Sequence, residues 1–278
     1  MGYRDLLLHL SGADEGSVAE RIHYAAALAA HSGAHLTCLF TRVPMPLASH
    51  YVPPALIAEH RAGIERSVTA AREQFEDSLR RYGIAGEWVE AEGSALDSIQ
   101  RHGRSMDLVI LGQRSAAKAD PVAGSDYGMG HLTQDLVFAL GRPVVRLPRQ
   151  GKPAERFGRV MIGWNGKKEA TRAVHDALPM LARAETVIVL CVDAGGLKTT
   201  PGSELARHLA RHDVRVEVVV SPERDGRAGS VLLDMAVTHR ADLLVMGAYG
   251  YMRWRERIFG GATEAVLDGA KIPVLFSH

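Results

Sequence analysis

The chain has 278 residues, of which 46% are hydrophobic and 23% are charged, a composition typical of a folded globular protein and unlike that of a disordered one. Its 33 basic and 32 acidic side chains leave a net charge of +1, which gives no global electrostatic reason to expect a nucleic acid or an anionic membrane as partner. Its two cysteines exclude a disulfide framework, and no apolar run reaches the roughly 18 residues that span a bilayer. We therefore expect a soluble, cytoplasmic protein without membrane or nucleic-acid partners.

The first half of the chain alternates apolar runs with segments of helical period. It opens on the apolar run 6–8, which predicts a strand close to the N-terminus. A proline-rich loop over 44–54 then precedes a long helix, predicted from about Ala55 to Tyr82. A further strand is predicted at the apolar run 108–111.

The second half follows the same plan, with strands that are continuous apolar runs such as 187–190. Continuous runs are typical of strands covered on both faces, and hence of a parallel sheet flanked by helices. We predict strands near 158–164, 186–192, 214–220, 242–247 and 273–276. Helices are predicted between them, near 167–182, 202–212, 228–239 and 260–270.

The two halves also repeat each other at the level of single residues. The segments 106–112 and 241–247 each contain an aspartate, four apolar residues and a closing glycine. The first strands correspond as well, because 6–12 and 160–166 both run from apolar residues into a glycine turn. A repeat of this length indicates a duplicated domain, since solenoid units are only about 20–50 residues long.

The boundary between the two halves is expected near 148–158, where prolines and glycines interrupt a basic stretch that has few apolar residues. We therefore predict two domains, 1–150 and 151–278. Strand–helix–strand order with right-handed crossovers gives each of them an open, doubly wound parallel sheet with helices on both faces. Ligands of such sheets bind beyond the carboxyl ends of the strands.

A glycine-rich segment follows the fourth strand of the second half. Gly247 and Gly250 would let the backbone approach a ligand and adopt positive φ. Gly260 and Gly261 stand where a helix begins, so their N–H groups and the helix dipole could hold a phosphate, with Thr263 adding a hydroxyl. The alternative is that these glycines only form a tight connection between strand and helix. Three arginines in the segment supply positive charge: Arg253, Arg255 and Arg257.

The spacing Gly247-x2-Gly250-x9-Gly260, followed by a nearby threonine, resembles the nucleotide loop of the universal stress protein family. The segments 160–166 and 272–274 resemble the first strand and the closing strand of that family. The resemblance implies a tandem pair of five-stranded parallel domains, Rossmann-like and adenine-nucleotide alpha-hydrolase-like. It also implies ATP binding, alone or with Mg²⁺, and a cytoplasmic stress-response role. Family members commonly form dimers or pseudo-dimers through the last strand, so we expect a pseudo-dimer within the chain and leave a homodimer open.

The same resemblance assigns a set of residues to the nucleotide, and we assign no catalytic and no metal-binding residue. These are Gly247 and Gly250 against the ribose and phosphates, Gly260, Gly261 and Thr263 around the phosphate tail, Asn165 near the adenosine, and Val192 against the base.

Two of these positions depart from the family pattern. Asn165 stands where the family usually has an aspartate, so it keeps an acceptor and loses the charge. Gly261 replaces the usual serine or threonine, which removes a hydroxyl and keeps the backbone N–H. We expect these changes to reduce or alter the affinity for ATP without abolishing it.

The first half departs further from the pattern. Gly112 and Gly130 keep the outer glycines, but Ser115 replaces the middle one. The segment also carries Asp120 and Asp126, and carboxylates beside a triphosphate are unfavourable unless a metal bridges them. We expect the N-terminal domain to have lost ordinary ATP binding and to serve packing or another ligand.

Three functions remain open from the sequence. The favoured one is an ATP-binding regulatory protein in which nucleotide bound by the C-terminal domain biases an interaction with an unknown protein partner. The second is a slow ATPase or self-phosphorylating enzyme that depends on Glu256 or Thr263. The third is an interaction module whose nucleotide sites are vestigial. The sequence contains no G-x4-G-K-[S/T] and no G-x-S-x-G segment, so neither a Walker-type ATPase nor a nucleophile-elbow hydrolase is supported.

Overall fold

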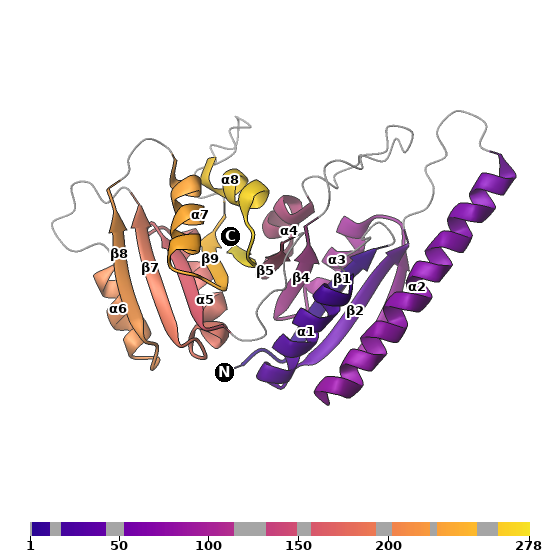
Figure 1. Ribbon diagram of the computed structural model, residues 1–278, viewed down its shortest axis with the longest axis horizontal. Coiled ribbons are helices and arrows are strands. Elements are labelled where there is room, and N and C mark those ends of the chain that lie inside the picture. The colour runs from indigo at the N-terminus through magenta and orange to yellow at the C-terminus, as the bar shows by residue number, and fades with distance from the viewer. Residues whose placement is uncertain are drawn as a thin grey trace. The chain divides into compact units, whose positions relative to one another are not determined.

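The chain forms two compact units, Gly2–Gln150 (the N-terminal unit) and Gly151–His278 (the C-terminal unit), in a computed structural model (Figure 1). The structure describes residues 2–11, 18–42, 53–113, 132–148, 157–192, 202–222, 227–248 and 261–278.

The N-terminal unit is a parallel sheet of five strands in the order β3-β2-β1-β4-β5, with all described pairs parallel. The strands are β1 (Asp5–Ser11), β2 (His35–Arg42), β3 (Gly86–Glu92), β4 (Leu108–Gly112) and β5 (Val144–Leu147). The helices are α1 (Val18–Ser32), α2 (Pro54–Tyr82), α3 (Ala95–Gly103) and α4 (Leu132–Leu140).

The C-terminal unit has the same strand order, β8-β7-β6-β9-β10, and its described pairs are also parallel. The strands are β6 (Arg159–Trp164), β7 (Thr186–Val192), β8 (Val216–Ser221), β9 (Leu243–Gly247) and β10 (Val274–Ser277). The helices are α5 (Lys168–Leu181), α6 (Ser203–Ala210), α7 (Ala228–Thr238) and α8 (Gly261–Gly269).

These elements confirm the prediction of open parallel sheets with helices between the strands. The observed bounds lie close to the predicted ones because the apolar runs of the strands are covered on both faces. The segment 187–190, for example, is fully buried. Burial also raises the pKa of the thiols of Cys38 and Cys191, which keeps both protonated as small core residues.

Two glycines show how helices cover opposite faces of the C-terminal sheet. A Cβ on Gly163 in β6 would lie 2.9 Å from Cδ2 of Leu232 in α7. A Cβ on Gly247 in β9 would instead meet the first turn of α5. Because Gly163 pairs with Met246, the residue before Gly247, these two Cβ positions point to opposite sides of the sheet. Helix α5 therefore packs on one face of the sheet and α7 on the other.

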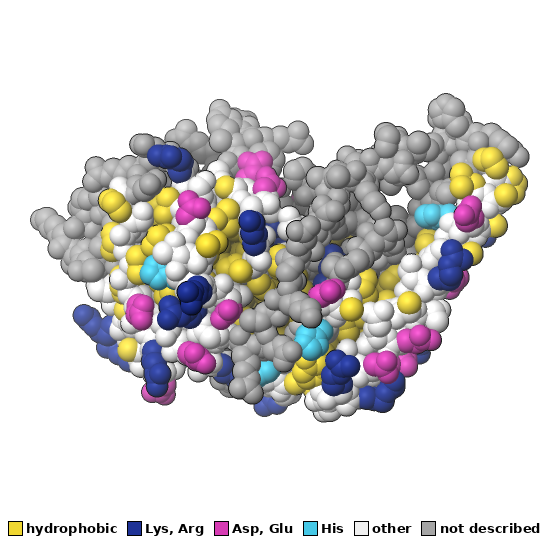
Figure 2. All heavy atoms as spheres, in the orientation of Figure 1, with side chains coloured by type: hydrophobic (Ala, Val, Ile, Leu, Met, Phe, Trp, Pro, Cys, Tyr) yellow, Lys and Arg dark blue, Asp and Glu magenta, His cyan; other side chains and the backbone are white. Residues whose placement is uncertain are grey.

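The surface reflects the balanced composition of the chain. On the face shown in Figure 2, basic and acidic side chains are interspersed over both units and do not gather into one patch of a single sign. Among the helices that the structure describes, none combines the length and the apolar character that crossing a membrane would require.

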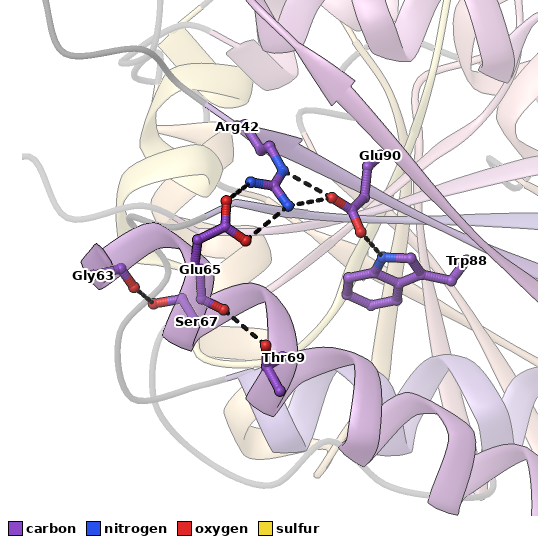
Figure 3. Close-up of polar contacts among 7 residues, drawn as sticks. All are labelled: Arg42, Gly63, Glu65, Ser67, Thr69, Trp88 and Glu90. Carbon is purple, nitrogen blue, oxygen red and sulfur yellow. Dashed lines mark hydrogen bonds and ion pairs between the residues drawn. The ribbon is translucent and has the colours of Figure 1, made fainter. Parts of the chain in front are cut away.

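An ion-pair cluster ties helix α2 to the sheet of the N-terminal unit (Figure 3). Arg42, the last residue of β2, donates through Nε to Oε2 of Glu90 in β3 at 2.7 Å. Its Nη1 and Nη2 donate to the two carboxylate oxygens of Glu65 in α2, the second at 3.2 Å. Trp88 donates through Nε1 to the other oxygen of Glu90 at 3.0 Å. Bidentate arginine–carboxylate geometry of this kind holds Glu65, and with it this turn of α2, next to the ends of β2 and β3.

The cluster shifts the titration of Glu90. Partial burial alone would raise the pKa of the Glu90 carboxyl, but the hydrogen bonds from Arg42 and Trp88 and the positive charge of Arg42 together outweigh it. The net result is a pKa below the ordinary value of 4.5. A carboxyl with a lowered pKa in the folded state adds stability above its unfolded pKa, and this stability is lost as the pH falls through the folded pKa.

We therefore expect Glu90→Gln to lower the free energy of unfolding by about 0.5–1 kcal/mol at pH 7, and by less at pH 3, which lies below the ordinary pKa of 4.5, so that the unfolded chain has already taken up the proton. Urea unfolding at the two pH values measures the difference. Glu92→Gln, on the same strand and exposed, is the matched control and should change neither value. An equal loss from Glu90→Gln at both pH values would contradict the assignment.

Candidate functional site

Three predicted residues meet at the edge of the C-terminal sheet where its strands end, here called the carboxyl edge. Trp164 in β6 pairs with Cys191 in β7, which places Asn165 beside Val192. Gly163 pairs with Met246, which places Gly247 beside Trp164. Val192, Asn165 and Gly247 thus lie at the carboxyl ends of the adjacent strands β7, β6 and β9, with Asn165 directly after the middle strand. This edge is where open α/β sheets bind ligands.

Asn165 shapes the turn that leads from β6 into α5. Its Oδ1 accepts a hydrogen bond from the backbone N–H of Lys167 at 3.0 Å, and Gly166 between them has φ +71°. The side chain of Asn165 is exposed, and α5 begins at Lys168, directly after the turn. An aspartate could accept the same bond, so asparagine at this position preserves the turn and removes one negative charge.

Gly247 is required by packing. A Cβ at this position would lie 2.4 Å from the backbone N of Ala170 and 2.4 Å from the carbonyl carbon of Glu169, both in the first turn of α5. Its φ lies outside the left-handed region, so the predicted positive φ is wrong for Gly247. The missing side chain lets the N-terminus of α5 rest directly on the end of β9.

The N-terminus of α8 is held in place by small residues. A Cβ on Gly229 of α7 would lie 2.7 Å from Cβ of Ala265 and 2.8 Å from the carbonyl oxygen of Ala262, so the two helices pack closely. Gly261 is the first residue of α8 and is exposed, and no atom of the described residues beyond the adjoining backbone lies within 4 Å of where its Cβ would stand. Thr263 is buried in the same turn, with 4% of its surface exposed. The first N–H groups of a helix and its dipole favour an anion.

The remaining predicted residues of the loop, Gly250 and Gly260, lie outside the described residues, as do the three arginines of the same segment. One residue that the sequence does not single out lies against the site: Glu169, whose side chain is buried in the first turn of α5. An acidic residue in a first helical turn is common because it suits the dipole, and such residues are usually exposed. Nothing in the sequence distinguishes Glu169 from that ordinary case.

Residues 156–278 match the model of the Universal stress protein family. The C-terminal unit is therefore a universal stress protein domain. The resemblance drawn from the glycine loop is thereby confirmed at the level of the family, which is one of stress-response proteins.

The chain is also similar to other universal stress proteins. The chain is 22% identical over 209 residues to Universal stress protein Slr1230 of Synechocystis sp., a match that covers 72% of this chain and 68% of that protein. A solved universal stress protein from Archaeoglobus fulgidus DSM 4304 matches with a TM-score of 0.75 and 18% identity, covering 98% of this chain and 95% of that one. A putative universal stress protein from Pseudomonas aeruginosa UCBPP-PA14 matches with a TM-score of 0.58 and 16% identity, covering 99% and 93%. At these identities, the solved structures establish the fold.

The N-terminal unit has the strand order of the universal stress protein domain and a different carboxyl edge. A Cβ on Gly112 would lie 1.8 Å from Cζ of Arg21, so the guanidinium of α1 covers the end of β4. Arg21 is 4% exposed and donates through Nη2 to the carbonyl oxygen of Gln113 at 3.2 Å. His9 and Thr41, at the ends of β1 and β2, are buried and lie 2.9 Å apart, His9 Nε2 to Thr41 Oγ1. Polar side chains of the chain itself therefore line this edge.

The C-terminal unit, in contrast, presents an exposed turn and an open helix start at its carboxyl edge. Such an edge can bind an anionic ligand whose phosphates approach the N-terminus of α8 and whose remaining groups extend over the strand ends towards Asn165 and Val192. Among the residues that the structure describes, no three His, Cys, Asp or Glu side chains are grouped so as to hold a metal ion.

The packing role of Gly247 predicts a loss of stability in Gly247→Ala. The added methyl group collides with the backbone of α5, which can avoid it only by moving away from the sheet. We therefore expect the free energy of unfolding to fall by about 1–3 kcal/mol. Thermal or urea unfolding measures this loss. Gly261→Ala is the matched control, because its methyl group meets no atom of the described residues beyond the adjoining backbone within 4 Å. Equal stability of the two variants would show that α5 adapts freely.

Proposed function

We propose that the C-terminal unit is an ATP-binding regulatory domain. The observation that carries the proposal is the exposed start of α8 at Gly261, fixed by the close α7–α8 contact and following β9 in the chain. Backbone N–H groups at a helix start, without a side chain in front of them, are suited to phosphate oxygens. A universal stress protein domain with this feature is expected to use it for a nucleotide.

In this proposal, each predicted residue keeps a role at the carboxyl edge. The turn at Asn165 would border the nucleoside, and Val192 would offer apolar surface to the base. Gly247 would act indirectly, since it seats α5. The phosphate tail would be held by the first turn of α8 together with the glycines of the preceding loop, Gly250 and Gly260, and with Gly261 and Thr263.

Magnesium would enter this site with the nucleotide. The described residues offer no group of three ligating side chains, and Mg²⁺ commonly binds nucleotide phosphates with only one or two protein carboxylates and several waters. The functional output that we propose is a change in affinity for a protein partner upon nucleotide binding. The output requires no catalytic residue.

We propose further that the N-terminal unit does not bind ATP in this way. Its Arg21 guanidinium covers the end of β4 at the position where the C-terminal unit has the backbone of α5 and the Cβ of Glu169. The buried pair of His9 and Thr41 also replaces the apolar surface that Val192 offers in the C-terminal unit. One nucleotide per chain is therefore expected.

The decisive experiment is calorimetric titration of the full chain with Mg-ATP, comparing Gly261→Asp with Gly261→Ala. A carboxylate at the helix start favours the dipole and repels phosphate, so Gly261→Asp should keep the melting temperature and weaken ATP binding at least tenfold, by about 1.4 kcal/mol or more. Gly261→Ala should retain binding within about threefold. Gly250→Val tests the preceding loop in the same assay.

Titration with AMP locates the phosphates. AMP lacks the β- and γ-phosphates, so Gly261→Asp should weaken AMP binding less than it weakens ATP binding. Failure of the folded native protein to bind Mg-ATP would refute the proposal. If Gly261→Asp still binds one ATP per chain with the affinity of the native protein, the nucleotide would instead lie in the N-terminal unit.

A further inference from the structure

Glu169 is a buried carboxylate at the carboxyl edge of the C-terminal unit. It is the second residue of α5, and only 5% of its surface is exposed. Its Cβ lies 2.8 Å from the position that a Cβ on Gly247 would occupy, so its side chain starts directly over the end of β9. The packing of α5 on Gly247 thus places the carboxylate at the edge of the sheet where the nucleotide site is proposed.

The two oxygens of this carboxylate have different surroundings. Oε1 lies 3.6 Å from Nζ of Lys168, whose side chain is 85% exposed. Oε2 is buried and accepts no hydrogen bond from the residues that the structure describes. A buried carboxylate oxygen without a donor is costly, and an isolated case in a native protein calls for a missing partner such as a water, an ion or a ligand group.

The chemistry of the surroundings selects the kind of donor. Phosphate is excluded as a partner of Oε2 because two anions would repel each other at this depth. A metal cation at Oε2 does not fit the surroundings, because Lys168 already lies near the carboxylate and, among the described residues, no further ligating side chains are grouped around it. A neutral hydroxyl donor fits best. Acidic side chains at the carboxyl edge of α/β sheets accept hydrogen bonds from ribose hydroxyls in this way.

We propose that Glu169 recognises the ribose of the nucleotide by accepting hydrogen bonds from its 2′- and 3′-hydroxyl groups. This inference rests on the proposed nucleotide site and adds a specificity for ribose to it. Glu169 is the group that selects a ligand with a vicinal diol over one without, and the N-terminus of α8 provides the affinity for phosphate. In the absence of nucleotide, the unpartnered oxygen is a cost to the fold.

The test compares binding of ATP and of 2′,3′-dideoxy-ATP by the native protein, by Glu169→Gln and by Glu204→Gln. Glu204 is the second residue of α6 and is exposed, so it matches Glu169 in helix position but not in burial. The native protein and Glu204→Gln should prefer ATP by about 10- to 100-fold, the effect of a hydrogen bond to a charged group. Glu169→Gln should bind ATP more weakly and reduce this preference to less than about threefold.

The melting temperature of the nucleotide-free variants gives a second readout. Removing the buried charge should leave the melting temperature of Glu169→Gln unchanged or raise it by a few degrees. A fall of several degrees, with ATP and dideoxy-ATP weakened equally, would make Glu169 a structural residue and overturn the proposal.

The native protein alone separates the remaining outcomes. If it binds ATP and dideoxy-ATP equally well, the ribose assignment is wrong and the nucleotide site stands. If Glu169→Gln keeps the preference for ATP but loses its dependence on Mg²⁺, the carboxylate serves a cation, and the ribose assignment is again wrong. If the native protein binds neither nucleotide, the proposed function itself fails.

Discussion

The contact between the first turn of α5 and Gly247 determines how the carboxyl edge of the C-terminal unit is built. Because Gly247 at the end of β9 has no side chain, the backbone of α5 occupies the space that a Cβ at this position would need. This close approach positions the turn at Asn165, the start of α5 and the carboxylate of Glu169 relative to the strand ends. Small residues act similarly between α7 and α8, where Gly229 sets the position of the helix start at Gly261. The edge is thus defined by two places where backbone meets backbone.

The two units have the same strand order and different side chains at their carboxyl edges. Both have five parallel strands in equivalent order, and both have a glycine at the end of the fourth strand over which the first helix of the unit packs. In the N-terminal unit, the space above that glycine is occupied by the guanidinium of Arg21, and a buried histidine–threonine pair lies beside it. In the C-terminal unit, the backbone of α5 and the Cβ of Glu169 fill the equivalent space, and the neighbouring turn at Asn165 is exposed. Fold alone therefore does not fix function, because the side chains that line the edge differ.

The sequence predicts the elements well because each strand is a continuous apolar run, and such runs have few alternatives to a sheet buried on both faces. The reason for a glycine at position 247 cannot be read from the sequence, because a positive φ, a close ligand and a close helix all select glycine. Only the position of α5 in the fold distinguishes these three reasons. Glu169 was missed for a related reason. An acidic residue in a first helical turn satisfies the dipole whether it is exposed or buried, and its burial depends on a contact with a strand far away in the chain. The polar edge of the N-terminal unit depends on register in the same way, because His9 and Thr41 meet only after β1 and β2 have paired.

Helix α2 illustrates how an element can belong to a fold only in part. Its buried side chains are Val68, Ala71 and Phe75, and between Pro54 and Ser67 none of its side chains is buried. Arg42 donates hydrogen bonds to Glu65, three residues before the first buried side chain of the helix, Val68. The turns between Pro54 and Glu65 are therefore stabilised mainly by their own backbone hydrogen bonds, and a helical segment of this length is marginal in water. These turns can therefore unwind and re-form while the core of the unit stays intact, which gives the chain a segment whose local opening is decoupled from global unfolding.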